Sequence, residues 1–254
     1  MIRGERFVAA DPGAVAEEAA RRFVAAARQA VAARGHFTCA LAGGSTPKAL
    51  YERLAAPPHR DHLDWRRVEV CFGDERCVPP EHPDSNYGLA RRALLDAVAV
   101  PPGRIHRIEG EHGDGAARYE AALRAIFGAH VPFPVFDLIL LGLGADGHTA
   151  SLFPHTPALA ERTRWVVRQR LAKLEADRIT LTAPVLGHAR QVLVTACGVE
   201  KAAVLRALAT QPEDPAAHPI LLVRPSGGGP TWLLDRAAAS GLPPSLPEPL
   251  DEAD

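Results

Sequence analysis

The stretch LGLGADGHTASLFP holds the most distinctive chemical groups in the sequence, an acid and an imidazole two residues apart. Asp146, Gly147 and His148 follow the apolar segment 136–142, which the sequence predicts to be the strongest strand, so the pair lies on a flexible turn at a strand end. A histidine has an ordinary pKa of about 6.5, and its neutral form can accept a proton near neutral pH. Asp146 and His148 are therefore suited to general-base chemistry.

Gly142, Gly144 and Gly147 in the same stretch also spell GxGxxG, the spacing of a dinucleotide-binding loop. That motif belongs to the first strand of a βαβ unit and needs an acidic residue at the end of the next strand. Glu161, at about the right distance, instead precedes the predicted strand 165–170. We therefore expect neither a nicotinamide nor a flavin cofactor.

A second loop, LAGGSTPKAL, is suited to phosphate. Gly43 and Gly44 allow a tight turn, and Ser45 and Thr46 present hydroxyl and N–H groups at a helix start marked by Pro47. Backbone N–H groups at a helix N-terminus favour anions. An ordinary glycine turn with a helix cap explains this loop about as well, and it lacks the GKS or GKT ending of a nucleotide-binding loop.

Charged residues at other element boundaries are further candidates. Asp74, Glu75 and Arg76 crowd the end of a predicted strand, and the Arg76 guanidinium can bind an anion or an oxyanion. Arg178 begins another predicted strand, and basic residues at such positions are usually solvated. Lys201 lies near a helix N-terminus, where a cation is better tolerated if an anion sits between. Lys201 thus points to a second phosphate contact.

The elements that must position these loops alternate between apolar strands and helices. We predict helices over 12–34, 46–55, 85–98, about 115–127, 199–208 and 231–240, and strands over 37–42, 68–72, 136–142, 165–170, 178–182, 191–196 and 220–223. This order indicates an α/β fold with a mostly parallel, Rossmann-like sheet and helices on both faces. In such sheets the site lies beyond the carboxyl ends of the strands. We expect residues 1–240 to form one domain and the Pro-rich acidic tail 241–254 to be disordered.

Composition excludes several classes of protein. The 254 residues are 47% hydrophobic and 23% charged with a net charge of −1, so a disordered chain and a basic field for nucleic acid or an acidic membrane are not expected. The sequence shows no signal peptide, no membrane-spanning run, and no metal-binding spacing among its four cysteines and 11 histidines. We expect a cytoplasmic monomer or weak homo-oligomer with reduced cysteines, no metal, and neither nucleic acid nor a membrane as partner.

Six segments occur in an order that resembles the 6-phosphogluconolactonase family: LAGGSTP, GDERCVPPEHPDSN, LGLGADGHTASLFP, RITLTAPVL, GVEK and WLLDRAAA. The resemblance covers residues 7–240. It implies a Rossmann-like fold shared with glucosamine-6-phosphate deaminases and ribose-5-phosphate isomerases, a phosphorylated sugar lactone as substrate, and neither metal nor nucleotide cofactor. One departure is Ala42 before the glycine pair, where a serine is common in the family.

The resemblance also implies roles for the candidate residues. His148 would be the general base that activates water, with Asp146 and Asp74 shaping its position and charge, and Arg76 would steady the substrate or the developing oxyanion. The phosphate would rest on the loop and on two cations, namely Gly43, Gly44, Ser45, Thr46, Arg178 and Lys201. Hydrolysis of an activated ester needs a positioned water, a base and oxyanion stabilisation. The sequence has no GxSxG elbow to supply a serine nucleophile.

Two other functions remain open on this fold. A glucosamine-6-phosphate deaminase or sugar-phosphate isomerase shares the glycine loop and the DGH turn, but where the deaminases resemble one another in a glutamate five residues after the histidine, this chain has Phe153. A non-catalytic sugar-phosphate sensor of the regulator type needs a DNA-reading module. The single amphipathic helix before the first predicted strand leaves no room for one, and Asp146 and His148 favour catalysis.

Overall fold

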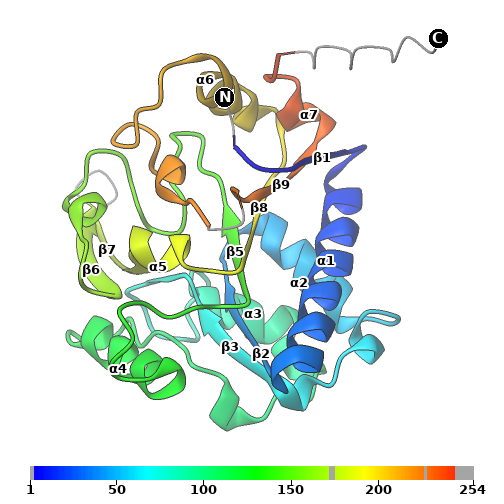
Figure 1. Cartoon of the computed structure of the whole chain (residues 1–254), viewed down its shortest axis with the longest axis vertical. Helices are drawn as coiled ribbons and strands as arrows, with labels where there is room; N and C mark the ends of the chain where they lie inside the picture. Colours follow the sequence, from blue (N-terminus) through cyan, green and yellow to red (C-terminus); the bar gives the residue numbers. More distant parts are fainter. Residues whose placement is uncertain (1–2, 172–174, 226–227, 244–254) are drawn as a thin grey trace.

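A six-stranded parallel sheet forms the centre of the computed structural model, which describes residues 3–171, 175–225 and 228–243 (Figure 1). Its strands run in the order β1-β9-β8-β5-β2-β3 and every neighbouring pair is parallel. They are β1 (Arg6–Ala9), β9 (Thr231–Asp235), β8 (Gln191–Ala196), β5 (Leu138–Gly142), β2 (Phe37–Leu41) and β3 (Val68–Phe72). The inner strands are apolar runs because both of their faces are buried.

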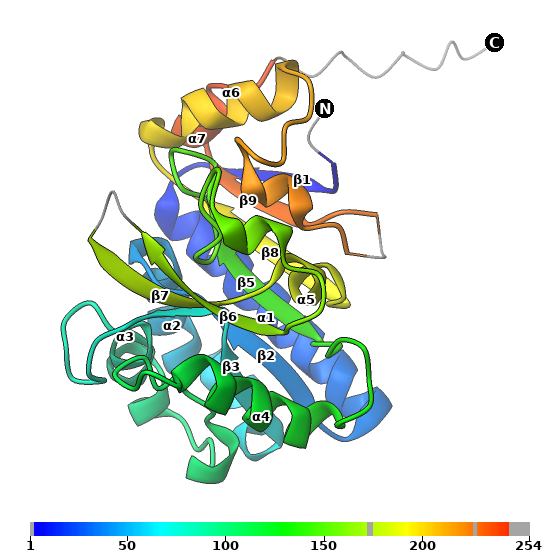
Figure 2. The same cartoon turned by 90° about the vertical axis from the view of Figure 1, so that its left-hand side faces the viewer.

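Helices cover both faces of this sheet (Figure 2). In Figure 2, α1 (Pro12–Arg34) and α2 (Ser45–Ala55) lie behind the sheet, while α4 (Gly115–Phe127) and α5 (Ala183–Gly187) lie in front of it. The remaining helices are α3 (Asn86–Ala93), α6 (Ala202–Thr210) and α7 (Arg236–Ala239). Within the described ranges, no helix combines the length and the apolar character needed to cross a membrane.

Local chemistry sets the ends of the long first helix. The Asp11 side chain accepts a hydrogen bond of 2.8 Å from the backbone N of Ala14, and Pro12 occupies the first helical position. Gly35 ends the helix with φ 82°, a left-handed conformation that favours glycine. Between these ends, residues such as Phe23 and Ala27 form a buried stripe against the sheet.

A second, three-stranded antiparallel sheet lies in front of the first in Figure 2. It has the order β4-β7-β6, with β4 (Asp74–Arg76), β7 (Ala176–Leu181) and β6 (Val166–Leu171). Gly73 joins the two sheets, because its N–H donates to the Leu41 carbonyl at the end of β2 and its carbonyl accepts from the N–H of Leu181 in β7. Asp74 and Arg76 are thereby held at the carboxyl edge of the parallel sheet.

Several sequence predictions are confirmed and several are wrong. Helix 12–34 and strands 68–72 and 191–196 are found at the expected bounds, and the parallel sheet with covered faces is confirmed. The predicted helix 231–240 is instead β9 followed by the four-residue α7, and the predicted strand 220–223 is a 3₁₀ turn (Pro219–Leu222). Residues 232–235 are buried between β8 and β1, and a short apolar run does not by itself distinguish a buried strand from a helix.

Other boundaries also differ. The predicted helix 85–98 ends at Ala93 and the predicted helix 199–208 starts with a 3₁₀ turn over residues 199–201. Strands β1 and β4 were not predicted, and the strands predicted at 165–170 and 178–182 belong to the antiparallel sheet. The tail predicted to be disordered lies, from residue 244 onward, outside the described residues.

Candidate active site

The chain changes direction across the sheet between β2 and β5. From β2 it proceeds to β3 on one side, and from β5 it proceeds to β8 and β9 on the other. In open α/β sheets, ligands bind at such a switch point, in the crevice beyond the carboxyl ends of the strands. The glycine loop after β2 and the GLGADGH turn after β5 meet there.

A pocket of about 260 Å³ lies at this switch point. It brings together eight of the ten predicted site residues: Gly43, Gly44, Ser45, Thr46, Asp74, Arg76, His148 and Lys201. Its volume is at the low end for ligand sites and suits a small metabolite. A larger hollow of about 700 Å³ lies near the opposite ends of the strands, but there the carboxylate of Glu69 is occupied by Arg104 and His106 at 2.8 and 2.7 Å.

His148 lines one wall of the pocket and forms a tight pair with Asp146, which does not itself line the pocket. The Oδ1 atom of Asp146 lies 2.5 Å from Nδ1 of His148 and 3.2 Å from its backbone N. An ionised carboxylate only accepts hydrogen bonds, so Nδ1 carries the proton and Nε2 of the neutral ring is the free base. Partial burial raises the pKa of Asp146, but the hydrogen bonds from the ring and backbone of His148, together with the charge that this ring carries when protonated, outweigh burial, and the pKa lies below its ordinary value.

The glycines of the loop after β5 shape this turn. Gly147 has φ 83°, which favours glycine, and a Cβ on Gly144 would lie 2.0 Å from Nδ1 of His148. Strand β5 continues into this irregular turn rather than into a helix, so the GxGxxG spacing here supports the imidazole. The Phe153 ring stacks on the face of the His148 imidazole, with ring centroids 4.2 Å apart and an interplanar angle of 18°.

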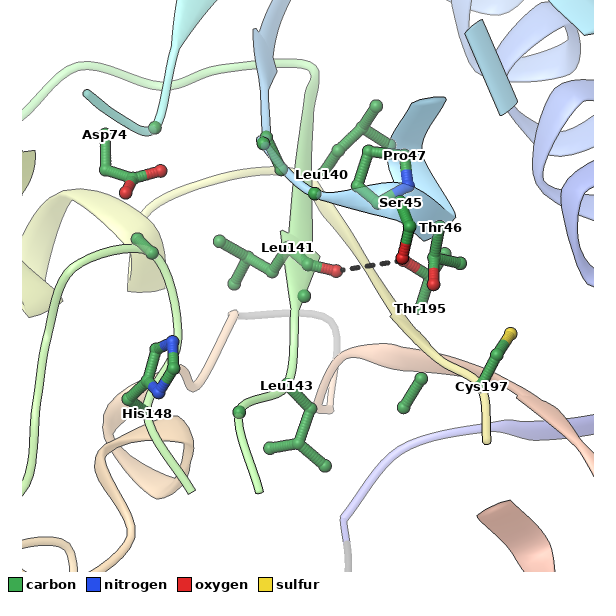
Figure 3. Close-up of a pocket in the computed structure, with 18 of the residues that line it drawn as sticks. Ser45, Thr46, Pro47, Asp74, Leu140, Leu141, Leu143, His148, Thr195 and Cys197 are labelled. Carbon is green, nitrogen blue, oxygen red and sulfur yellow. Dashed lines mark hydrogen bonds between the residues drawn. The ribbon is translucent and has the colours of Figure 1, made fainter. Parts of the chain in front are cut away.

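The glycine loop after β2 forms the facing wall. Figure 3 shows Ser45, Thr46 and Cys197 on one side of the pocket and His148 and Asp74 on the other. Helix α2 begins at Ser45, one residue before the predicted start, and Gly44 precedes it with φ 107°. The first-turn N–H groups of α2 thus lie beside the pocket, where they favour an anion.

Asp74 is buried and held from two sides. Its Oδ2 accepts a hydrogen bond of 2.6 Å from the Ser151 hydroxyl, and its Oδ1 accepts one of 3.2 Å from Nδ2 of Asn86. Among the described residues no hydrogen bond joins Asp74 to His148. Asp74 therefore does not position the imidazole through direct contact.

Glu75, the neighbour of Asp74, does not line the pocket and serves a structural purpose. Its carboxylate accepts from the backbone N of Arg76, Asn86 and Tyr87 and from the Ser85 hydroxyl. Burial raises the pKa of Glu75 above its ordinary value, and the backbone donors offset only part of that effect. Glu75 ties the start of α3 to β4, so Asn86 reaches Asp74.

Two arginines lie beside each other at the edge of the small sheet. Arg76 lines the pocket and Arg178 stands directly opposite it in the β4–β7 ladder, although Arg178 does not line the pocket itself. Burial and then the charge of Arg76 lower the pKa of Arg178. Like charges directly opposite in a ladder repel each other, which an anion bound nearby would relieve.

Lys201 and Cys197 complete the wall near α2. The ammonium of Lys201 has a nearby acid only in Glu200, at 3.9 Å, among the residues that the structure describes. Burial, followed by the charge of Asp235, raises the pKa of Cys197 to about 11. Cys197 therefore stays a neutral thiol near neutral pH and is not a nucleophile.

Sequence reasoning overlooked several residues of the site. Thr195 and Cys197 line the pocket at the end of β8, and the Thr195 hydroxyl donates to the Leu141 carbonyl at 3.4 Å (Figure 3). Ser151 and Asn86 hold Asp74. The available clues were the position of Thr195 and Cys197 at the carboxyl end of a predicted strand and that of Asn86 in the same loop segment as Asp74, whereas Ser151 lies 77 residues from Asp74.

Comparisons with known proteins show the family of the chain. The sequence model of the family described as glucosamine-6-phosphate isomerases/6-phosphogluconolactonase matches residues 10–232. The 6-phosphogluconolactonase of Synechocystis sp. is 43% identical over 220 residues, which cover 85% of this chain and 89% of the relative. The 6-phosphogluconolactonase of Streptomyces coelicolor is 39% identical and covers 94% and 95% of the two chains.

Solved structures show the same fold. The 6-phosphogluconolactonase of Trypanosoma brucei superposes with a TM-score of 0.82 at 29% identity, covering 96% of this chain and 100% of that one. A monomeric glucosamine-6-phosphate deaminase superposes with a TM-score of 0.74 at 21% identity, covering 94% and 100%, and this likeness concerns the fold alone. The chain therefore belongs to the family of glucosamine-6-phosphate isomerases and 6-phosphogluconolactonases.

Proposed function

We propose that this protein hydrolyses 6-phospho-D-glucono-1,5-lactone to 6-phospho-D-gluconate, the lactone-opening step of the oxidative pentose phosphate pathway. The observation that carries the proposal is the Asp146–His148 pair facing the N-terminus of α2 across one small pocket. A base at one wall and an anion site at the other match a substrate with a lactone at one end and a phosphate at the other. The names of the relatives support the same reaction.

The mechanism begins with the free Nε2 atom of His148. Nε2 takes a proton from a water as the water oxygen bonds to the lactone carbonyl carbon, and the carbonyl π electrons move onto oxygen. Arg76 stabilises this oxyanion with its guanidinium. The oxyanion then collapses, the bond from carbon to the ring oxygen breaks, and the ring oxygen takes the proton back from Nε2. This route forms no covalent bond to the protein.

Asp146 supports the base and the opposite wall binds the phosphate. The Asp146 carboxylate stabilises the imidazolium formed when Nε2 is protonated, because it accepts the Nδ1 hydrogen bond throughout. The backbone N–H groups of Gly44, Ser45 and Thr46, which form the proposed phosphate loop, donate hydrogen bonds to the phosphate oxygens. Lys201 supplies positive charge beside this loop. Arg178 acts at longer range through its position beside Arg76.

The test is hydrolysis of freshly generated lactone, measured against its spontaneous rate in the presence of a chelator and without nucleotide. We expect the His148→Ala variant to lose about 10²- to 10⁴-fold in kcat, the usual contribution of a general base. The exposed His62, which lies outside the pocket, provides the control variant His62→Ala with unchanged activity. The His148→Ala variant should still bind phosphate ligands, because His148 lies across the pocket from the phosphate loop (Figure 3).

Other results would contradict the proposal. A wild-type protein that does not exceed the spontaneous rate, or a chelator that abolishes activity, would rule out this metal-free lactonase mechanism. Release of ammonia from glucosamine 6-phosphate would instead identify a deaminase. Phe153 argues against that outcome, since the ring stacked on His148 occupies the position of the acid that the deaminases have there.

A further inference from the structure

A buried serine joins the loop that carries His148 to the small antiparallel sheet. Ser151 lies three residues after His148 and is 1% exposed. Its hydroxyl donates the 2.6 Å hydrogen bond to Oδ2 of Asp74, which lines the pocket on the same side as His148 (Figure 3). The bond between Ser151 and Asp74 thus connects the turn after β5 with strand β4.

Each strand of the small sheet contributes one group to Ser151. Besides Asp74 on β4, Thr180 on β7 accepts a hydrogen bond of 3.2 Å from the Ser151 backbone N, and Gln169 on β6 donates through Nε2 to the Ser151 carbonyl. Thr180 also stands directly opposite Asp74 in the β4–β7 ladder. Hydrogen bonds with the small sheet therefore hold the backbone N–H, the carbonyl and the hydroxyl of Ser151.

The turn between His148 and Ser151 needs such support. Ala150 has φ 46°, a left-handed conformation that a residue with a Cβ seldom adopts. Backbone strain of this kind persists only where surrounding contacts enforce it, and it is common at functional sites. The Thr149 hydroxyl, which donates to the Gly142 carbonyl at 2.8 Å, and the bonds to Ser151 hold the two ends of the turn.

We propose that Ser151 is a positioning residue, whose hydroxyl fixes the Asp74 carboxylate in the pocket relative to His148. The inference rests on the proposed lactone hydrolysis for its kinetic readout. Within the described part of the chain, Ser151 is the side-chain donor to Oδ2, and the bond from Asn86 to Oδ1 is longer at 3.2 Å. Without the Ser151 hydroxyl, the buried Asp74 carboxylate loses the shorter of these two hydrogen bonds and can rotate.

The first experiment compares Ser151→Ala with a matched control, Ser85→Ala. Ser85 is equally buried and its hydroxyl also donates to a carboxylate, at 3.0 Å to Oε2 of Glu75, which does not line the pocket. We expect Ser151→Ala to lower kcat about 10- to 100-fold, because a small shift of Asp74 or of the turn that carries His148 disturbs the geometry at the reacting centre, with KM changed less. Ser85→Ala should keep the wild-type kcat and KM.

A kinetic outcome can overturn the inference directly. Equal kcat and KM for Ser151→Ala and Ser85→Ala would show that Ser151 contributes only to folding. Thr180→Val provides a second variant that leaves the hydroxyl of Ser151 in place and removes the acceptor of its backbone N–H. It should lower kcat in the same direction, and an unchanged kcat would contradict the role of the small sheet.

A measurement independent of activity separates this inference from the proposed function. Unfolding by urea is measured for wild type, Ser151→Ala, Asp74→Asn and the double variant. If the two residues are coupled, the effects on stability are not additive. Additive effects would overturn the inference even if the lactone is hydrolysed. Coupling together with a wild-type protein that does not hydrolyse the lactone would contradict the proposed function and leave the contact supported.

Discussion

The imidazole of His148 is held at its edge and at its face. Asp146 engages Nδ1 at 2.5 Å, and Phe153 stacks on the ring at a centroid distance of 4.2 Å. Since the pKa of Asp146 lies below its ordinary value, the carboxylate stays ionised near neutral pH and keeps the proton on Nδ1. These two contacts leave Nε2 as the nitrogen that is free to act as a base.

Lys201 is the lysine that lines the pocket together with the phosphate loop, and its role can be tested by a single substitution. We expect Lys201→Ala to raise KM about 10- to 100-fold with little change in kcat, because loss of one charged hydrogen bond weakens the ground state and transition state alike. Arg178→Ala should raise KM less, since Arg178 does not line the pocket. Steady-state kinetics with the lactone measure both effects.

Lys48 provides the control for that prediction. It lies on α2 close to the phosphate loop in sequence, is exposed, pairs with Glu52 at 3.0 Å and does not line the pocket. Lys48→Ala should leave KM unchanged. A fall in kcat at constant KM in Lys201→Ala would place this ammonium at the reacting end of the substrate instead.

At the scale of elements, the starts of α2 and α3 meet behind the phosphate loop. A Cβ built on Gly43 would lie 1.8 Å from Oδ1 of Asn86, the first residue of α3. The same Asn86 amide donates to the carbonyl and the carboxylate of Asp74. The position of the phosphate loop and that of Asp74 are thus linked through one buried side chain.

Gly43→Ala should therefore destabilise the fold and reduce activity together. The methyl group displaces Asn86 from Asp74, and overpacking of this kind costs about 1–3 kcal/mol in the free energy of unfolding. Urea denaturation and lactone kinetics measure the two effects. The double variant Gly43→Ala/Asn86→Ala should regain part of the stability, because it removes the atoms that clash.

Gly103 provides the comparison for Gly43. A Cβ at Gly103 would meet nothing within 4 Å, so Gly103→Ala should be neutral or slightly stabilising. If Gly43→Ala were as stable and as active as Gly103→Ala, the close approach of Asn86 to the phosphate loop would not constrain the site.

At the scale of the whole molecule, Glu120 links the helix layer to the small sheet. This buried residue of α4 accepts hydrogen bonds from Arg124 at 2.9 Å, from Arg164 at 3.1 Å and from the backbone N of Trp165 at 3.1 Å. Burial raises its pKa, but the two arginines outweigh burial, and the pKa lies below the ordinary 4.5. The ionised form is therefore the one that stabilises the fold.

The stabilisation by Glu120 depends on pH. Below pH 4.5 the unfolded chain protonates Glu120 before the folded protein does, so the stabilisation is present above that pH and is lost as the pH falls through the folded pKa. Glu120→Gln should lower the free energy of unfolding near neutral pH by about 2 kcal/mol, with the difference from wild type shrinking in acid. Urea denaturation across this pH range measures it.

Glu52 is the matched surface carboxylate for this experiment. Its side chain is exposed and pairs with Lys48. Exposed pairs contribute about 0–1 kcal/mol, so Glu52→Gln should change stability little at any pH. A Glu120→Gln variant whose deficit is as large in acid as at neutral pH would contradict the assignment of the stabilisation to the charged form.

Local patterns were enough to predict the elements with strong periodicity or capping. Helix α1 has Asp11, Pro12 and Gly35 at its ends, and β3 and β8 are apolar runs bounded by loops, so sequence alone predicts their bounds. Strand β9 was mistaken for a helix because its apolar residues are followed by the helix-favouring segment RAAA. Only pairing with β8 and β1 makes these residues a strand.

Which groups are available for chemistry is readable from local sequence, because loop motifs such as GGSTP and DGH place glycine, hydroxyl, acid and imidazole at strand ends. Tertiary structure alone decided how those groups meet. Asp74 and Ser151 are 77 residues apart and come together only because Gly73 passes the chain from one sheet to the other. Periodicity and capping act over a few residues, whereas contacts of this kind depend on the packing of distant elements, which local pattern does not encode.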